Sequence, residues 1–125
     1  MPKMKSIVLV EDDEFLAELY ATKLKMEKFD VSLATDGEKG WKTINEKRPD
    51  LVLLDIILPK MDGFEILTKM KASSELKDTP VILLTNLSQR DEVKRGLDLG
   101  ANDYLIKAHF MPSEVVKKIK TLLGE

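Results

Sequence analysis

The chain has no cysteine, and this absence excludes a disulfide framework and a zinc site built on thiolates. It also has no apolar run long enough to span a bilayer, and the N-terminal lysines are followed by Glu11 before a signal-peptide core could form. With 20 basic and 22 acidic residues the formal net charge is −2, which gives no basis for nucleic-acid binding. We therefore expect a cytoplasmic protein that binds neither nucleic acid nor a membrane.

What is present is the composition of an ordinary globular domain, with 43% hydrophobic and 34% charged residues. A chain of 125 residues buries roughly two-thirds of its unfolded surface, which is enough for a core without disulfides or a structural metal. No linker or low-complexity stretch divides it. We therefore predict a single domain over residues 1–125 without a separate output domain.

Five short segments are rich in apolar and β-branched residues and predict β-strands. Most are continuously apolar, as in a parallel sheet that helices cover on both faces. Segments of helical periodicity separate them, and candidate N-caps are Asp13, Asp36, Ser88 and Ser113, the last beside Pro112. The alternation predicts one doubly wound α/β domain with right-handed crossovers. The predicted strands are residues 6–10, 31–34, 51–58, 81–84 and 103–106.

Asp55 is a carboxylate between Leu54 and Ile56, inside an otherwise apolar predicted strand. An unpaired charge there would be costly, so Asp55 must have a partner or a function. A structural role, as a helix cap or in an ion pair with Lys107, and a functional role fit this residue about equally well. Ligands of open parallel sheets bind beyond the carboxyl ends of the strands, and the residues to consider there include Asp55 in the third predicted strand and Lys107 after the fifth.

Glu11, Asp12 and Asp13 follow the first predicted strand. Asp13 is the expected helix cap, but three acids are more than capping needs. If the first and third strands are neighbours, these carboxylates meet Asp55, and each close pair repels by roughly 4 kcal/mol. One lysine cannot neutralise them, whereas a hard divalent cation can, and a site with few carboxylates and room for water suits Mg²⁺.

A carboxylate, a magnesium ion, a lysine and a hydroxyl around one cavity suit phosphoryl transfer. In that chemistry the cation and Lys107 offset charge on the phosphoryl oxygens, Thr85 donates a hydrogen bond, and Asp55 supplies the attacking oxygen. The sequence therefore suggests a phosphoacceptor site.

Four segments then carry a family resemblance over essentially the whole chain. They are IVLVEDDEFL, LVLLDIILPKMDGFEIL with its D-x-x-x-P-x-x-D-G pattern, PVILLTN and GANDYLIK. They resemble the acidic-pair, phosphorylation, threonine and lysine segments of the receiver domain of two-component response regulators, in particular the stand-alone chemotaxis type. The resemblance implies a flavodoxin-like sheet of order 2-1-3-4-5, an aspartyl phosphate, and a histidine kinase or histidine phosphotransfer protein as donor.

The resemblance also implies roles for individual residues. Asp55 becomes the phosphoacceptor, and Tyr104 occupies the aromatic switch position, although a half-buried strand tyrosine explains it equally well. Such a domain is a switch that assists its own phosphorylation and dephosphorylation, and not an enzyme in the usual sense. The implied magnesium ligands are Glu11, Asp12, Asp55 and the Ile57 carbonyl, and the implied phosphoryl contacts are Thr85, Asn86 and Lys107.

Two positions depart from the family pattern. The family usually has a cis proline after the lysine, but here Ala108 follows Lys107, so either this bond is a costly non-proline cis peptide or the loop is rebuilt. Asn86 follows Thr85 where the family tends to carry a small residue. We expect Asn86 to narrow the access of water and so to slow dephosphorylation.

The segment 88–99 is the expected switching element, because its apolar stripe is thin and Gly96 costs about 1 kcal/mol relative to alanine in a helix. The resemblance places output on the face of the fourth helix, fifth strand and fifth helix, toward an unknown output protein. His109 is expected beside this face as a loop residue and not as a metal ligand. The domain is expected to be a monomer or a phosphorylation-dependent dimer.

Three other functions compete with this interpretation. A phosphatase of the haloacid dehalogenase type would need a second aspartate two positions after the nucleophile, where this chain has Ile57. A flavodoxin-like cofactor binder would need a phosphate loop after the first strand, where Glu11 and the two aspartates after it would repel phosphate. A degenerate receiver would act as an adaptor without phosphorylation, although every functional side chain is in place.

Overall fold

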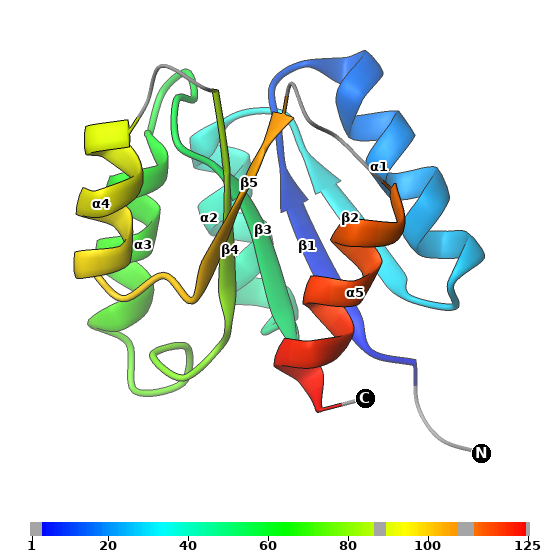
Figure 1. Cartoon of the computed structure of the whole chain (residues 1–125). Coiled ribbons are helices and arrows are strands. Elements are labelled where there is room, and N and C mark those ends of the chain that lie inside the picture. Colours follow the sequence, from blue (N-terminus) through cyan, green and yellow to red (C-terminus); the bar gives the residue numbers. More distant parts are fainter. Residues whose placement is uncertain (1–3, 87–89, 108–111, 125) are drawn as a thin grey trace.

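The computed structural model describes residues 4–86, 90–107 and 112–124. Its centre is a five-stranded parallel sheet in the order β2-β1-β3-β4-β5, which confirms the predicted topology (Figure 1). Val8 on β1 lies opposite both Ser32 on β2 and Val52 on β3. The strand order therefore reverses between β1 and β3, where a doubly wound sheet binds its ligands. The strands are β1 (Ser6–Val10), β2 (Asp30–Ala34), β3 (Leu51–Asp55), β4 (Val81–Thr85) and β5 (Asp103–Ile106).

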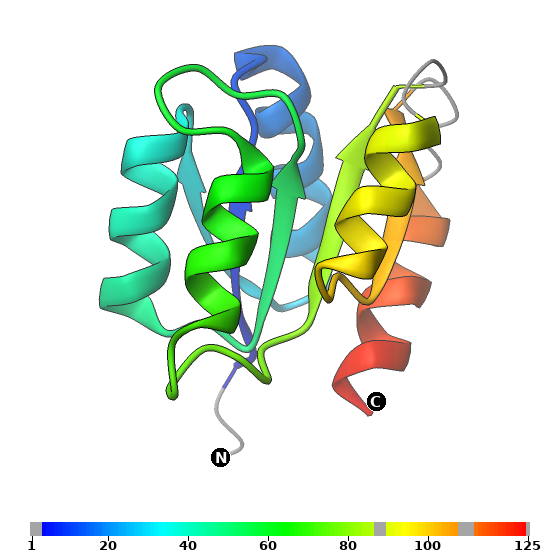
Figure 2. The ribbon, with the colours of Figure 1, turned by 90° about the vertical axis from the view of Figure 1, so that its left-hand side faces the viewer.

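Helices cover both faces of the sheet, which explains why its central strands are apolar throughout (Figures 1 and 2). On one face the first and last helices bury Leu24 and Ile119, and on the other face the three remaining helices bury residues such as Ile44 and Leu67. Within the described residues, no helix is both long and apolar enough to cross a membrane. The helices are α1 (Glu14–Met26), α2 (Gly37–Lys47), α3 (Gly63–Lys71), α4 (Arg90–Asp98) and α5 (Pro112–Leu123).

The third strand is shorter than its apolar sequence predicted, because β3 ends at Asp55 and not at Leu58. Beyond it the Ile56 carbonyl accepts a hydrogen bond from the Gly63 N–H (2.8 Å), which turns the chain toward α3. Ile56 and Leu58 are buried in the core on the α3 side of the sheet, whereas Ile57 is 56% exposed. Packing beneath a helix therefore explains the apolar residues after Asp55, and only the Ile56 N–H continues the pairing, with the Leu84 carbonyl oxygen of β4 (3.3 Å).

Aspartate side chains begin two helices as predicted. Asp13 and Asp36 each accept a hydrogen bond from the backbone N–H three residues further on, at 3.1 and 2.9 Å. The predicted cap at Ser113 is wrong, because α5 begins at Pro112 and Ser113 lies in its first turn. Proline suits that first position, since its φ is already helical and it has no N–H to satisfy. The predicted cap at Ser88 lies outside the described residues.

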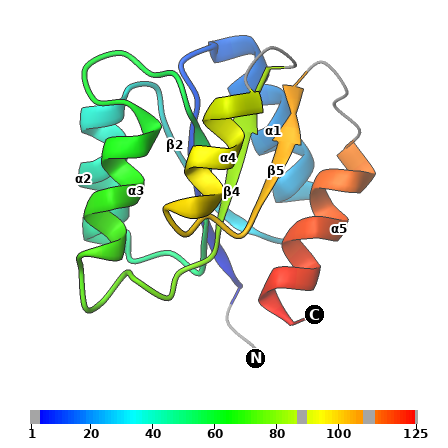
Figure 3. The same ribbon diagram turned by 60° about the vertical axis from the view of Figure 1, so that its left-hand side comes forward.

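α4 packs beside β4 (Figure 3). Val93 is partly buried against the core and Leu97 is 39% exposed, which confirms the thin apolar stripe. Gly96 is buried, and a side chain there would collide with Leu83 of β4. Glycine in this helix is therefore required for its close approach to the sheet, beyond the helix propensity that it costs.

Candidate functional site

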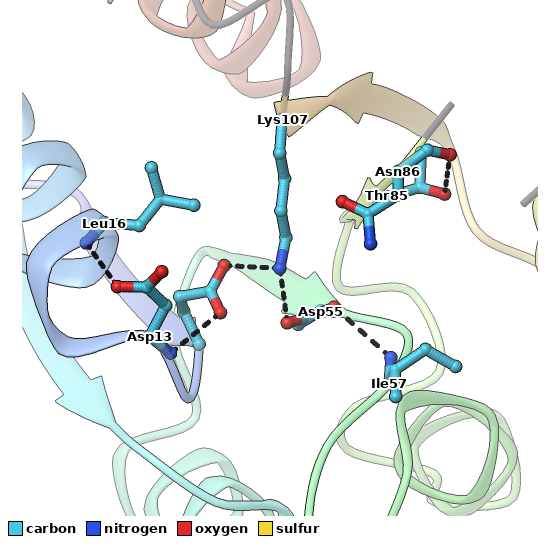
Figure 4. Close-up of polar contacts among 8 residues, drawn as sticks. Asp13, Leu16, Asp55, Ile57, Thr85, Asn86 and Lys107 are labelled. Atoms are coloured by element: carbon cyan, nitrogen blue, oxygen red, sulfur yellow. Dashed lines mark hydrogen bonds and ion pairs between the residues drawn. The ribbon is translucent and has the colours of Figure 1, made fainter. Parts of the chain in front are cut away.

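Three strand ends bring charged side chains together at one edge of the sheet. Glu11 directly follows β1, Asp55 is the last residue of β3, and Lys107 directly follows β5. Because β4 lies between β3 and β5, Lys107 must extend past the end of β4 to reach the other two residues (Figure 4). The fold thus joins residues that are up to 96 positions apart, which is the difference between 107 and 11 in the sequence.

Lys107 bridges the two buried carboxylates. Its Nζ lies 2.6 Å from Asp55 Oδ2 and 2.7 Å from Glu11 Oε1, and the Glu11 side chain is fully buried. Burial lowers the pKa of Lys107, but its contacts with Asp55 and Glu11 outweigh that effect and raise the pKa above its ordinary value. The predicted ion pair with Asp55 is present, and Glu11 is a second partner that the prediction did not name.

The two carboxylates hold more negative charge than Lys107 neutralises. Burial raises the pKa of Glu11 to about 7, with Lys107 opposing the rise and Asp55 adding to it. Burial also raises the pKa of Asp55, although Lys107 favours its charged form. Binding of a further positive charge, either a proton or a cation, is therefore favoured at this site.

Asp12 adds a third carboxylate to this pair. Glu11, Asp12 and Asp55 each place one oxygen so that all three oxygens lie within 4.8 Å of one another. An all-oxygen set of this size suits a hard divalent cation, and the exposure of Asp12 leaves a side open to water, as Mg²⁺ requires. The residues fit Mg²⁺, because the ion would supply the positive charge that Lys107 alone does not provide for the two buried carboxylates.

Two backbone amides hold the carboxylates in place. The Asp13 N–H donates to Glu11 Oε2 (3.1 Å), and the Ile57 N–H donates to Asp55 Oδ1 (3.2 Å; Figure 4). In each carboxylate the other oxygen is thereby left to face Lys107. Sequence reasoning missed these two donors, because every residue except proline carries an N–H and only the folded chain decides where it points.

Thr85 ends β4 between β3 and β5 and is 1% exposed. Its hydroxyl donates to the Asn86 carbonyl oxygen (3.2 Å), on the opposite side of Lys107 from the start of α1 (Figure 4). Tyr104 is 39% exposed and lines a groove between α4 and β5 together with Thr85 and Asn86. This partial exposure agrees with both interpretations of Tyr104, the switch and the strand tyrosine.

The predictions about the Lys107–Ala108 peptide bond and about His109 concern residues 108–111, which lie outside the described residues.

Glu11 should make the protein less stable as the pH rises from about 4.5 to about 7. Burial raises its pKa from 4.5 to about 7, so the folded state binds more protons than the unfolded state in this window, and the free energy of unfolding falls with pH. The loss is up to about 3 kcal/mol. Chemical denaturation without divalent cations measures it, and Glu11→Gln should flatten the slope. An equal slope in both proteins would contradict the assignment to Glu11.

The fold and site define a class of protein, a doubly wound α/β domain with an acidic cation site and a lysine-paired aspartate at its switch point. The chain belongs to the response regulator receiver domain family, whose model matches residues 7–120. It is therefore a signalling domain of the two-component type and not a classical enzyme. Phosphorylation of an aspartate and binding of Mg²⁺ at an acidic pocket are general to this family.

Curated relatives include two transcriptional regulators. RpaA of Synechocystis sp., a DNA-binding dual master transcriptional regulator, is 37% identical over 120 residues, which cover 96% of this chain and 49% of RpaA. The DNA-binding response regulator MtrA of Mycobacterium tuberculosis is 38% identical over 117 residues, which cover 94% of this chain and 50% of MtrA. The chain thus spans about half the length of these relatives.

Solved structures that are similar to this chain belong to the same family. The receiver domain of the sensor histidine kinase PA1611 from Pseudomonas aeruginosa, with a magnesium ion coordinated in its active-site cleft, has a TM-score of 0.89 at 27% identity, covering 98% of this chain and 100% of that one. A CheY-like response regulator receiver domain protein from Methanospirillum hungatei also has a TM-score of 0.89, at 28% identity, covering 98% and 95% of the two chains.

Proposed function

We propose that Asp55 accepts a phosphoryl group from a phosphohistidine of a histidine kinase or histidine phosphotransfer protein, in the cytoplasm. The observation that carries this proposal is the convergence of Glu11, Asp55 and Lys107, with Lys107 Nζ within 2.7 Å of both carboxylates. Glu11, Asp12, Asp55 and the Ile57 carbonyl are the proposed ligands of Mg²⁺. When bound, this ion offsets negative charge on the carboxylates and on the incoming phosphoryl oxygens.

In the transfer, one oxygen of Asp55 bonds to phosphorus while the bond to the donor nitrogen breaks, and that nitrogen keeps the electron pair. Asp55 must react as a carboxylate, and the Ile57 N–H and Lys107 both favour this form. As charge moves from the carboxylate to the phosphoryl oxygens, the Lys107 ammonium needs to move little to follow it. Water later hydrolyses the acyl phosphate, which resets the domain.

A protein donor needs an accessible surface beside the phosphoacceptor, and exposed apolar side chains supply one. Phe15 is 78% exposed in the first turn of α1, and Ile57, two residues after Asp55, is 56% exposed. Exposed apolar side chains of this size, on the two chain segments that directly follow Glu11 and Asp55, support docking of a protein more than docking of a small molecule.

In the proposed output, a conformational change passes from Thr85 to the surface formed by α4, β5 and α5. The Thr85 hydroxyl, which donates to the Asn86 carbonyl, would donate to the phosphoryl group instead. That movement opens space beside the groove in which Tyr104 lies. Because α4 is weakly packed, a small change at this groove biases its position and the surface that a partner protein contacts.

Incubation of the protein with acetyl phosphate and Mg²⁺ tests this function. We expect intact mass spectrometry to show one added phosphoryl group, which an excess of chelator prevents, and amide exchange within residues 90–106 to change on phosphorylation. No added group would favour an adaptor without phosphorylation, whereas steady turnover of many phosphate esters would favour a phosphatase. Unchanged exchange over α4 and β5 would refute the output face alone.

Asn86→Ala should shorten the lifetime of the phosphorylated protein severalfold. Asn86 is exposed directly beside Thr85, so its side chain narrows the path of water to the acyl phosphate. The decay of the phosphoprotein after removal of acetyl phosphate measures the effect. Asn45→Ala, at an exposed position on α2, is the matched control. Equal half-lives of the native protein and Asn86→Ala would exclude this role.

A further inference from the structure

The loop that joins β3 to α3 contains a strained turn close to the proposed phosphoacceptor. Lys60 has a φ of 71°, and across it the Met61 N–H donates to the Pro59 carbonyl oxygen at 2.8 Å. A hydrogen bond between residues i and i+2 with a positive φ between them is the rarer and more strained form of the γ-turn. Such a conformation costs roughly 1–3 kcal/mol and persists only where its surroundings hold it.

The near end of this loop is anchored beside the site. The Ile56 carbonyl accepts a hydrogen bond from Gly63 at the start of α3 (2.8 Å), and the Ile57 N–H donates to Asp55 (3.2 Å). The orientation of the Ile57 carbonyl therefore depends on the backbone path of the residues that follow it. The turn at Pro59 begins only two residues after Ile57, so whatever holds this turn in place can influence that carbonyl.

The support comes from the first turn of α2. The Gly37 N–H donates to the Pro59 carbonyl oxygen (3.1 Å), which is the same oxygen that closes the γ-turn. A β-carbon on Gly37 would collide with the backbone carbonyl group of Met61. Asp36, which caps α2 through one oxygen, places the other oxygen 3.8 Å from the Lys60 ammonium. The loop therefore rests directly on the backbone of α2, at a contact that only glycine permits.

We propose that Gly37 is a positioning residue for the magnesium site, because it holds the turn at Pro59 and so directs the Ile57 carbonyl toward the metal position. The inference rests on the proposed function, in which that carbonyl is a ligand. The contact between Gly37 and Pro59 and the binding of Mg²⁺ must affect each other equally. If the contact strengthens Mg²⁺ binding, bound Mg²⁺ strengthens the contact by the same factor.

Gly37→Ala tests the proposal through Mg²⁺ affinity, measured by isothermal titration calorimetry in the absence of any phosphodonor. We expect the dissociation constant to rise about tenfold, as when a group that orients a metal ligand is lost. The matched control is Gly40→Ala on the same helix, whose added β-carbon has its three nearest contacts with the Val10 side chain (2.8 Å and beyond) and not with the loop. This control should lower the melting temperature and leave Mg²⁺ affinity unchanged.

A purely structural role of Gly37 predicts a different pattern, with lowered melting temperatures in both variants and native Mg²⁺ affinity in both. That result would overturn the inference and leave the proposed function intact. If the native protein itself bound no Mg²⁺, the proposed function would fail together with the inference.

The native protein gives a second test that does not depend on a variant that folds. Saturating Mg²⁺ should slow hydrogen exchange of the Gly37 amide by about the same tenfold factor, because its bond to Pro59 becomes more stable. The Gly40 amide, which donates within α2 to the Asp36 carbonyl (2.9 Å), is the internal reference and should not change. Equal exchange of the Gly37 amide with and without bound Mg²⁺ would overturn the proposal.

Discussion

Asp55→Asn should abolish the phosphoryl group that the native protein gains from acetyl phosphate and Mg²⁺. Asparagine has nearly the same shape and can still accept the Ile57 N–H (3.2 Å in the native protein), so the backbone around the site is preserved. It has no carboxylate oxygen that can form an acyl phosphate. We therefore expect intact mass spectrometry to show only the unmodified mass for this variant.

The matched control is Asp78→Asn, because Asp78 is an exposed aspartate before β4, away from the site. It should be phosphorylated as fully as the native protein. A phosphoryl group on the Asp55→Asn variant, located on Asp12 or Glu11 by peptide mapping, would contradict the assignment of the phosphoacceptor. Loss of phosphorylation in both variants would point to a general effect of losing a carboxylate.

Lys107→Met should destabilise the protein by about 3–5 kcal/mol at neutral pH. The Lys107 ammonium forms an ion pair with both Glu11 and Asp55, whose side chains are 0% and 4% exposed. Methionine fills a similar volume but leaves two buried carboxylates facing each other. Urea denaturation in the absence of divalent cations measures the change in the free energy of unfolding.

Two further observations make this prediction specific. The loss should shrink at lower pH, because burial already raises the pKa of Glu11 to about 7 and a protonated carboxyl no longer needs the lysine. It should also shrink when Mg²⁺ is added, since the ion supplies the missing positive charge. A loss that is unaffected by both would show that Lys107 acts by packing alone.

Lys118→Met is the control for removing a lysine from an ion pair. Lys118 Nζ lies 2.9 Å from Asp103 Oδ2, but the two side chains are 28% and 32% exposed. Solvent screens such a pair, so we expect a loss below about 1 kcal/mol with little response to Mg²⁺. Equal losses for the Lys107 and Lys118 variants would contradict the argument from burial.

Local sequence information is sufficient for part of this fold. Continuous apolar runs predicted the parallel sheet correctly, because a strand covered on both faces needs apolar side chains on both. The same rule made the third strand too long at Ile56–Leu58, since burial under α3 gives the same apolar pattern as burial in the sheet. Ser113 was predicted as a cap, yet Pro112 already begins the helix.

The sequence by itself determined the fold class and the side chains available to the site, because periodicity and residue type act over a few neighbouring residues. It placed the acids that begin with Glu11 directly after the first strand and Lys107 directly after the last, but it put Asp55 inside a third strand that was predicted too long. Only the tertiary structure decided that Lys107 is shared between Asp55 and Glu11, and that Gly37 supports the loop at Pro59. These contacts join residues far apart in the chain, often through backbone groups that every residue carries, so no local pattern encodes them.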